Sequence, residues 1–244
     1  MCGIFACISN GFSTPFMREQ GKKCNHRGPD STMEYKQKMY NQNIFFMFHR
    51  LAINGLDKLS NQPFNIGNVI LMCNGEIYNF DELARDYNIK LQTNSDCEII
   101  LHLYKLLGIH KTISLLDGVF SFILYDTTSH KIYIGHDPLG IRSLYMSTDD
   151  GLYVSSELKC LVNFQKHVDM VKPGVYHTYD IETKNHSVTS YFQLDCKPIF
   201  VNDETCIKLI QTNLKESVKK RLLSDQPIGC LLSGGLDSSI ITSL

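Results

Sequence analysis

The chain has 244 residues, enough for one large domain or one domain and part of another, and its 43% hydrophobic and 20% charged residues are typical of a globular protein. A formal net charge of −1 gives no electrostatic basis for binding nucleic acid or an anionic membrane. Apolar runs such as residues 44–48 are far shorter than the roughly 20 residues that span a bilayer, and the N-terminus lacks the pattern of a secretory signal.

The nine cysteines form an odd set with irregular spacing and no Cys-x-x-Cys pair. This pattern argues against a disulfide framework and against a metal site, and it favours a reducing, cytoplasmic compartment. We therefore expect most of the thiols to be small buried residues.

The N-terminal sequence Met1-Cys2-Gly3 contains a cysteine that becomes the first residue if Met1 is removed. Cys2 would then carry a free α-amine, with an ordinary pKa of about 8, beside a thiol with an ordinary pKa of about 8.5. One residue would hold both a nucleophile and the base that activates it, which is the chemistry of N-terminal nucleophile enzymes. The alternative is a small buried residue that precedes a strand, expected over residues 4–8.

Asn74-Gly75 lies between two apolar runs, and on local grounds this pair favours a hairpin turn. The alternative is that the side-chain N–H of Asn74 and the backbone N–H of Gly75 donate to an oxyanion, where glycine permits close approach. The elements expected before this pair are a short helix near 15–24, a turn-rich loop over 24–31, and strands over 44–53 and 68–73.

Ser95 and Glu98 have the spacing of a capping box for a helix expected over residues 96–108. Asp96 lies in its first turn, where a carboxylate complements the helix dipole; the alternative is that Asp96 holds a substrate ammonium. Many short antiparallel strands with a few helices indicate an α+β sandwich. The later strands are expected over 119–126, 131–136, 143–147, 152–156, 175–180 and 188–193.

The character of the chain changes after Tyr191. We expect a connector over 195–202, a helix over 203–223, and an apolar strand over 228–232 that leads into the glycine-rich loop 233–239. A strand, such a loop and a helix start together predict a phosphate-binding site built from backbone N–H groups. The loop lacks the lysine of a Walker A sequence, and a plain Gly-Ser turn is the alternative.

A series of motifs follows in a characteristic order. They are Met-Cys-Gly-Ile at 1–4, His-Arg-Gly-Pro-Asp at 26–30, Arg-Leu-Ala-Ile at 50–53, Gln-Pro-Phe at 62–64, Asn-Gly-Glu-Ile-Tyr-Asn at 74–79 and Ser-Asp-Cys-Glu at 95–98. With these motifs the sequence resembles the class II glutamine amidotransferases. Asp-Pro-Leu-Gly-Ile-Arg at 137–142, Ser-Glu-Leu-Lys at 156–159 and Ser-Gly-Gly-Leu-Asp-Ser-Ser at 233–239 narrow the resemblance to the glutamine-hydrolysing asparagine synthetases, over the whole chain.

The resemblance implies an αββα sandwich of the N-terminal nucleophile type, with two antiparallel sheets face to face and helices on both outer faces. It implies a glutaminase domain over 2–193, a linker over 194–202, and the beginning of an α/β ATP-binding domain of pyrophosphatase type over 203–244. Glutamine would be hydrolysed to glutamate and ammonia. In the family, ammonia then amidates aspartate through an acyl-adenylate, so the implied substrates are glutamine, aspartate and ATP, with Mg²⁺ for the synthetase half; a homodimer is one compatible assembly.

The catalytic residues implied by the resemblance lie in the N-terminal half. Cys2 would attack the amide carbon of glutamine, while its own α-amine or an adjacent water moves the proton. Asn74 and Gly75 would stabilise the tetrahedral oxyanion. Arg27 and Gly28 would support the position of the Cys2 amine.

The resemblance also implies binding residues. Arg50 would bind the α-carboxylate of glutamine and Asp96 its α-ammonium, with Leu51, Ile53 and Glu76 along the pocket. No metal ligand is implied in either half. The implied ATP-binding residues are Leu232, Ser233, Gly234, Gly235, Asp237, Ser238 and Ser239.

Four positions depart from the family pattern. The family usually has His at the position of Phe48, an aliphatic residue at that of Asn54, Arg at that of His136 and Pro at that of Ser143. None of these departures removes an implied catalytic group, but they bear on pocket shape and turnover.

The chain reaches only the start of the second domain, so we expect it to hydrolyse glutamine without making asparagine. One alternative function is a stand-alone or truncated amidotransferase that serves another acceptor, including a relative of β-lactam synthetase. Another is a glutamine-binding module without catalysis.

Overall fold

The computed structural model describes residues 1–198 and 200–244, and it divides into two compact units, Met1–Gln193 and Leu194–Leu244. Ile199, within the predicted linker 194–202, lies outside the described residues. No helix among the described residues is long and apolar enough to cross a membrane.

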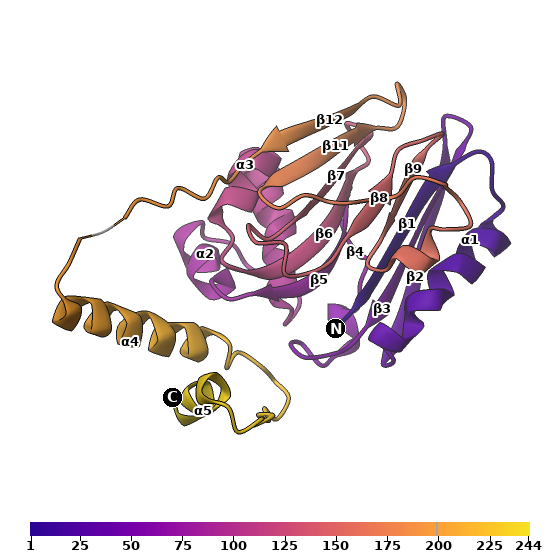
Figure 1. Cartoon of the computed structure of the whole chain (residues 1–244). Coiled ribbons are helices and arrows are strands. Elements are labelled where there is room, and N and C mark those ends of the chain that lie inside the picture. Colours follow the sequence, from indigo (N-terminus) through magenta and orange to yellow (C-terminus); the bar gives the residue numbers. More distant parts are fainter. Residues whose placement is uncertain (199) are drawn as a thin grey trace. The chain divides into compact units, whose positions relative to one another are not determined.

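The first unit contains two antiparallel six-stranded sheets (Figure 1). The first sheet, in spatial order, is β10 (Asp169–Met170), β8 (Tyr145–Ser147), β9 (Leu152–Ser155), β1 (Gly3–Ser9), β3 (Gln42–Arg50) and β2 (Ser31–Met39). The second sheet is β12 (His186–Ser190), β11 (Val175–Asp180), β7 (Lys131–His136), β6 (Gly118–Asp126), β5 (Val69–Ile77) and β4 (Phe64–Ile66).

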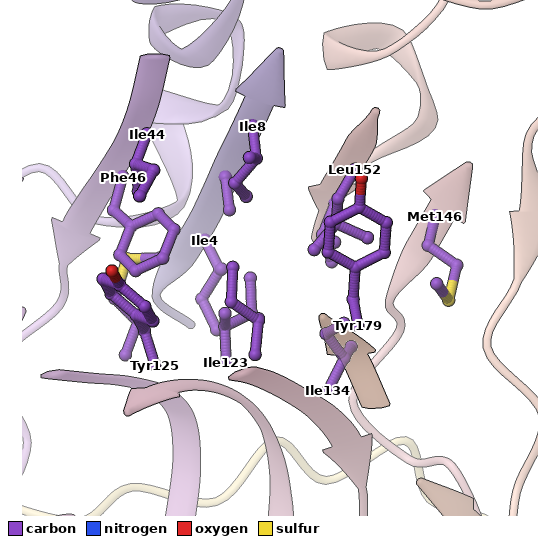
Figure 2. Close-up of a cluster of buried hydrophobic side chains, with 14 of the residues drawn as sticks. Ile4, Ile8, Ile44, Phe46, Ile123, Tyr125, Ile134, Met146, Leu152 and Tyr179 are labelled. Carbon is purple, nitrogen blue, oxygen red and sulfur yellow. The ribbon is translucent and has the colours of Figure 1, made fainter. Parts of the chain in front are cut away.

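The two sheets pack face to face through alternate residues of their strands, as period-two side-chain geometry requires. Ile4 and Ile8 of β1 and Phe46 of β3 meet Ile123 and Tyr125 of β6 in one buried cluster, and Figure 2 shows these side chains between the two layers. The other face of β1 is also buried, because Phe5 and Cys7 belong to a different cluster. β1 is therefore the central strand that fixes where Cys2 lies.

Helices cover the outer faces of both sheets. Helix α1 (Thr14–Gly21) contributes Met17 to the cluster on the outer face of the first sheet. Helices α2 (Phe80–Asp86) and α3 (Ile99–Leu115) contribute to the cluster on the outer face of the second. The predicted αββα sandwich of the α+β class is confirmed.

Three local predictions in this unit are wrong in detail. Helix 15–24 ends at Gly21 and continues as the 3₁₀ helix Lys22–Arg27. The capping box does not form, because the carboxylate of Glu98 accepts hydrogen bonds from the backbone of Gln92 and Thr93, both at 2.7 Å. A short 3₁₀ helix, Asp96–Glu98, therefore precedes α3, which continues past the predicted end at residue 108 with a kink at Gly108 (φ 73°).

Helix α2, strand β4 and the long strand β2 were not predicted from the sequence. Among the described residues, strand β2 pairs only with β3 and so lies at a sheet edge. Its mixture of polar and apolar residues carries a weak strand signal. Its strand conformation is supplied by the neighbouring β3, whose residues are nearly all buried.

The second unit contains the helices α4 (Asp203–Lys220) and α5 (Leu236–Ser243). The predicted strand over 228–232 is not one here, and Leu231 is fully exposed. A strand needs a hydrogen-bonding neighbour, and the described residues of this unit include no other strand to supply one.

Candidate active site

Cys2 lies at the start of the central strand, directly beside the end of β3. The last pair of the β1–β3 register is Gly3↔His49, and extending it by one residue places Cys2 next to Arg50. The backbone N–H of Leu51 lies 3.4 Å from the Cys2 Sγ, and the thiol lies 3.5 Å from the Leu51 carbonyl oxygen. Burial raises the pKa of this thiol, although the Leu51 N–H and the terminal amine favour the thiolate. The thiol therefore needs a base before it can act as a nucleophile.

Cys2 opens into a cavity where most of the predicted glutaminase residues meet. The two sheets and the loops after β3 and before α3 all contribute to its walls. The cavity has a volume of about 40 Å³ and is lined by Met1, Cys2, Arg50, Leu51, Ile53, Asn54, Ser60, Gln62, Cys73, Asn74, Gly75, Glu76, Ser95, Asp96, Cys97 and Arg142.

Asn74 and Gly75 are not in a hairpin turn, so the locally favoured prediction is wrong. Both lie inside β5, where Asn74 pairs with Ser121 and Gly75 with Phe120 of β6. A Cβ on Gly75 would lie 2.2 Å from the carbonyl oxygen of Val119. The close approach of β6 therefore requires glycine at this position, independently of any role in binding an oxyanion.

The backbone N–H of Gly75 faces the edge of β5 that borders the cavity. On that edge the N–H of Cys73 donates to Gln62 (2.6 Å), and the N–H of Ile77 donates to Asp96 (2.7 Å). Because backbone groups alternate in direction along a strand, Gly75 points the same way as these two residues. β4 pairs only with residues 69–71, which leaves this part of the edge open to the cavity.

The side-chain amide of Asn74 is the second donor at this place. Asn74 is buried, and its Nδ2 has no hydrogen-bond partner among the described residues. A buried N–H without an acceptor costs about 1–3 kcal/mol, so the arrangement is unfavourable unless a ligand supplies an oxygen. Asn74 and Gly75 thus present two N–H donors to one cavity.

Asp96 is a buried carboxylate in the wall of the same cavity. Its Oδ2 accepts a 2.7 Å hydrogen bond from the backbone of Ile77, and only 3% of the residue is exposed. Burial raises the pKa of Asp96 to about 6, and the neighbouring charge of Glu76 adds to the effect. A cationic ligand in the cavity would reverse this penalty.

Arg50 is buried and bonded to the loop that follows β3. Its terminal nitrogens donate to the carbonyl oxygens of Asp57 (2.9 Å) and Asn54 (3.2 Å), to the side chain of Asn61 (2.7 Å), and to the carbonyl oxygen of Gly55. The guanidinium therefore shapes the cavity by holding this loop. A substrate carboxylate at Arg50 would have to share these donors.

Arg27 and Gly28, at the end of the 3₁₀ helix Lys22–Arg27, were predicted to support the position of the Cys2 amine. The Nε of Arg27 donates to the carbonyl oxygen of Cys2 at 2.8 Å. A Cβ on Gly28 would lie 2.2 Å from the carbonyl oxygen of His49, so only glycine lets this loop pass so close to β3.

The four departures from the family pattern lie at different distances from the cavity. Phe48 belongs to the core between the sheets, and His136 Nε2 donates to the carbonyl oxygen of Lys172 (2.9 Å) outside the cavity lining. Ser143 donates to the carbonyl of Ser156 at 3.1 Å. Only Asn54 lines the cavity, and its buried Nδ2 lacks a hydrogen-bond partner within the part of the chain that is described.

Three residues near the cavity were not singled out from the sequence. The side-chain amide of Gln62 bonds to both the N–H and the carbonyl oxygen of Cys73, and Arg142 lines the cavity. Glu157 bonds to Arg27 and so connects to Cys2 indirectly. All three lie inside motifs that carry the family resemblance, and those motifs were the available signal.

Residues 233–235 of the second unit form a turn that leads into the N-terminus of α5, and residues 236–239 of the predicted loop belong to the first turn of that helix. Gly234 has a φ of 81°, and Ser238 and Ser239 donate their hydroxyls to the carbonyl of Gly235 at 3.1 and 2.8 Å. The Ser233 and Ser238 hydroxyls lie 2.9 Å apart. Leu232 and Asp237 flank this turn. No group of three or more metal-ligating side chains occurs among the described residues.

The family models divide the chain in two. The glutamine amidotransferase domain family matches residues 1–196, and the asparagine synthase family matches residues 209–244. The asparagine synthetases (glutamine-hydrolyzing) of Rattus norvegicus and Homo sapiens are each 38% identical to the chain, and that of Bos taurus is 39% identical. Each match covers 100% of this chain and 48% of the relative, so the chain spans about half the length of the curated relatives it matches.

Solved structures share the fold at low sequence identity. A glutamine phosphoribosylpyrophosphate amidotransferase from B. subtilis, complexed with ADP and GMP, has a TM-score of 0.65 and 18% identity over 79% of this chain and 50% of its own. A structure described as the allosteric regulatory enzyme of purine biosynthesis has a TM-score of 0.66, with the same identity and coverage. These likenesses support the sandwich fold.

Proposed function

We propose, from the premise that this chain belongs to the glutamine amidotransferase family, that its first unit hydrolyses glutamine with Cys2 as the nucleophile. The observation that carries the proposal is the convergence of Cys2, the unpartnered amide of Asn74 and the buried carboxylate of Asp96 on one cavity. These groups match the three needs of the reaction, which are a nucleophile, an oxyanion donor and an anchor for an amino acid.

Removal of Met1 is the first step of the proposal. With Met1 in place, the α-amine belongs to that residue, and Met1 forms part of the wall of a cavity of only about 40 Å³. Loss of Met1 would enlarge the cavity and transfer the free amine to Cys2. Burial, together with the positive charges of Arg27 and Arg142, lowers the pKa of the Met1 amine, and we expect the same surroundings to lower that of a Cys2 amine. A lowered pKa keeps more of the amine neutral and able to accept the thiol proton.

In the acylation step, the amine takes the proton of Cys2 and Sγ forms a bond to the carboxamide carbon of glutamine. The carbonyl electron pair moves onto oxygen, and Asn74 Nδ2 and the Gly75 N–H donate to that oxyanion. The intermediate collapses by breaking the C–N bond, and the amine returns its proton so that ammonia leaves. Water then attacks the thioester, releases glutamate and restores the thiol.

The binding groups hold the amino-acid end of glutamine. Asp96 pairs with the α-ammonium, which offsets the burial cost that raises its pKa. Arg50 attracts the α-carboxylate while holding the loop at residues 54–61. Leu51, Ile53 and Glu76 complete the wall of the pocket.

The complete protein would use the ammonia to convert aspartate to asparagine. This part of the proposal rests on the asparagine synthase match over residues 209–244 and on the named relatives. ATP would adenylate the aspartate side chain, and the loop 233–239 would take its pyrophosphate portion. Mg²⁺ would accompany the ATP, because this ion is usually held by substrate phosphates and only one or two carboxylates. A cytoplasmic location fits a reaction that depends on reduced thiols.

The test is glutamate release by the purified chain, together with its intact mass. We expect Met1 to be absent, glutamine to be converted to glutamate, and Cys2→Ala to abolish the conversion while the fold is retained. Chemical acetylation of the N-terminus should have the same effect as the substitution. Glutaminase activity that survives in Cys2→Ala would disprove the assignment of the nucleophile.

A further inference from the structure

The start of β1 is held by Ser155, the last residue of β9, and by Ser156, which follows it. The hydroxyl of Ser155 donates to the Ile4 carbonyl at 3.1 Å, and the Ile4 N–H donates to the hydroxyl of Ser156 at 3.0 Å. The backbone N–H of Ser156 also donates to the Ile4 carbonyl at 3.0 Å. Regular pairing of β1 with β9 ends at Phe5↔Ser155, so these contacts extend the support of β1 toward the nucleophile.

Glu157 continues this support to Cys2 itself through Arg27. Arg27 Nε donates to the Cys2 carbonyl at 2.8 Å, and its NH1 lies 3.3 Å from Oε1 of Glu157. The Arg27 side chain is only 10% exposed, so this pairing is shielded from water on most sides. The two partners are 130 residues apart in the sequence.

The carboxylate of Glu157 is kept ionised by its surroundings. Lys159 lies 2.8 Å from Oε2, and His26 lies 3.1 Å from Oε1. Partial burial alone would raise the pKa of Glu157, but hydrogen bonds from Lys159 and Arg27 outweigh it and hold the pKa below its usual range. Glu157 thus provides an anion that holds the Arg27 guanidinium while this group donates to the Cys2 carbonyl oxygen.

We propose that Glu157 is a positioning residue for the nucleophile, acting through Arg27 on the backbone of Cys2. This inference rests on the proposed glutaminase function. In the structure, Arg27 also contacts Met1, whose sulfur lies 3.9 Å from NH2. Removal of Met1 ends that contact but leaves the Cys2 carbonyl and Glu157 as the two partners of Arg27. The chain Glu157–Arg27–Cys2 then restrains the residue whose amine and thiol must both face the carboxamide.

The expected effect of Glu157→Gln is on turnover and much less on binding. A misplacement of about 1 Å in a reacting group can cost on the order of 10²-fold in rate. We expect kcat to fall about ten- to a hundredfold. KM should stay within about threefold, because Asp96 and Arg50, the proposed glutamine anchors, lie on other elements.

Glu34→Gln, at the edge of the first sheet, is a matched control. Glu34 also pairs with an arginine and a lysine, Arg18 at 2.6 Å and Lys36 at 2.6 Å, and its side chain is 22% exposed against 21% for Glu157. It lies on β2, away from the cavity lining. A comparable loss of kcat in Glu34→Gln would show a general effect of removing an ion pair and would overturn the proposal.

A double-mutant cycle tests whether Glu157 acts through Arg27. Glutaminase kinetics are measured for Glu157→Gln, Arg27→Gln and the double variant. We expect the double variant to be no slower than Arg27→Gln alone, because the carboxylate has no role once its partner is absent. If the fold-loss of kcat in the double variant equalled the product of the two single losses, Glu157 would not act through Arg27.

Alkylation of Cys2 by iodoacetamide, followed by peptide mass mapping, gives a readout that does not depend on turnover. A loosened N-terminus exposes the half-buried thiol, so we expect alkylation at least about threefold faster in Glu157→Gln and unchanged in Glu34→Gln. Equal rates in all three proteins would overturn the positioning role. An unmodified chain that fails to hydrolyse glutamine would refute the proposed function, whereas the alkylation ratio would still decide the role of Glu157.

Discussion

Asp96→Asn should make the protein more stable at neutral pH while it abolishes glutamine binding. The carboxylate is buried, with 3% of the residue exposed, and its Oδ2 accepts the Ile77 N–H at 2.7 Å. Asparagine has nearly the same shape and keeps an oxygen for this hydrogen bond. The substitution therefore removes the buried charge with little change in packing, and it also removes the proposed partner of the substrate ammonium.

The magnitude follows from the pKa. Burial raises the pKa of Asp96 from 3.8 to about 6, and a difference of about two pKa units corresponds to roughly 3 kcal/mol. Between these two values the unfolded chain has lost the proton and the folded chain still holds it. Stability of the unliganded protein therefore falls as pH rises from about 4 to about 6, and the full cost applies above that window.

Urea unfolding followed by circular dichroism at pH 4 and pH 7.5 measures this difference. We expect the stability of Asp96→Asn relative to the unmodified chain to be about 3 kcal/mol more favourable at pH 7.5 than at pH 4. That corresponds to roughly 6–12 °C in melting temperature for a domain of this size. Glutamine should stabilise the unmodified chain and leave the variant unchanged.

Asp180→Asn is the control of opposite sign. Asp180 accepts a 2.9 Å hydrogen bond from the Thr183 N–H, which lowers its pKa. Its ionised form therefore favours the folded state at neutral pH, and the variant should be relatively less stable at pH 7.5 than at pH 4. If Asp96→Asn changed stability equally at both pH values, the buried-charge account of Asp96 would be wrong.

Two further predictions concern the donors on β5. Asn74→Ala should lower kcat for glutamate release by about 10²–10³-fold with a small change in KM, because one oxyanion donor is lost. A variant with unchanged kcat and a raised KM would contradict that role. Gly75→Ala should destabilise the fold by about 3 kcal/mol in urea unfolding, because its Cβ would lie 2.2 Å from the Val119 carbonyl oxygen. An unfolding curve that matches the unmodified chain would show that β6 can move away.

Local patterns were least reliable where a distant segment provided the partner. Asn74-Gly75 has the composition of a hairpin turn, but β6 supplies a strand neighbour across the pair and keeps it extended. Ser95 and Glu98 have capping-box spacing, but the N–H groups of Gln92 and Thr93 compete successfully for the carboxylate. At Asn74-Gly75 a strand more than 40 residues away replaced the local hydrogen bond, and at Glu98 backbone groups five and six residues away did so.

The sequence by itself determined the α+β sandwich and the chemical types available to the site. Alternating apolar residues specify which face of each strand is buried, and this information is local. The motif order identified the family, and the N-terminal cysteine indicated the kind of nucleophile.

Only the tertiary structure decided how those groups meet. The unpartnered Asn74 amide, the edge position of the Gly75 N–H and the link from Glu157 through Arg27 to Cys2 depend on strand register and on loops far apart in the chain. Strand register is set by pairing and packing across the whole sandwich, so it cannot be predicted from the spacing of residues within one segment.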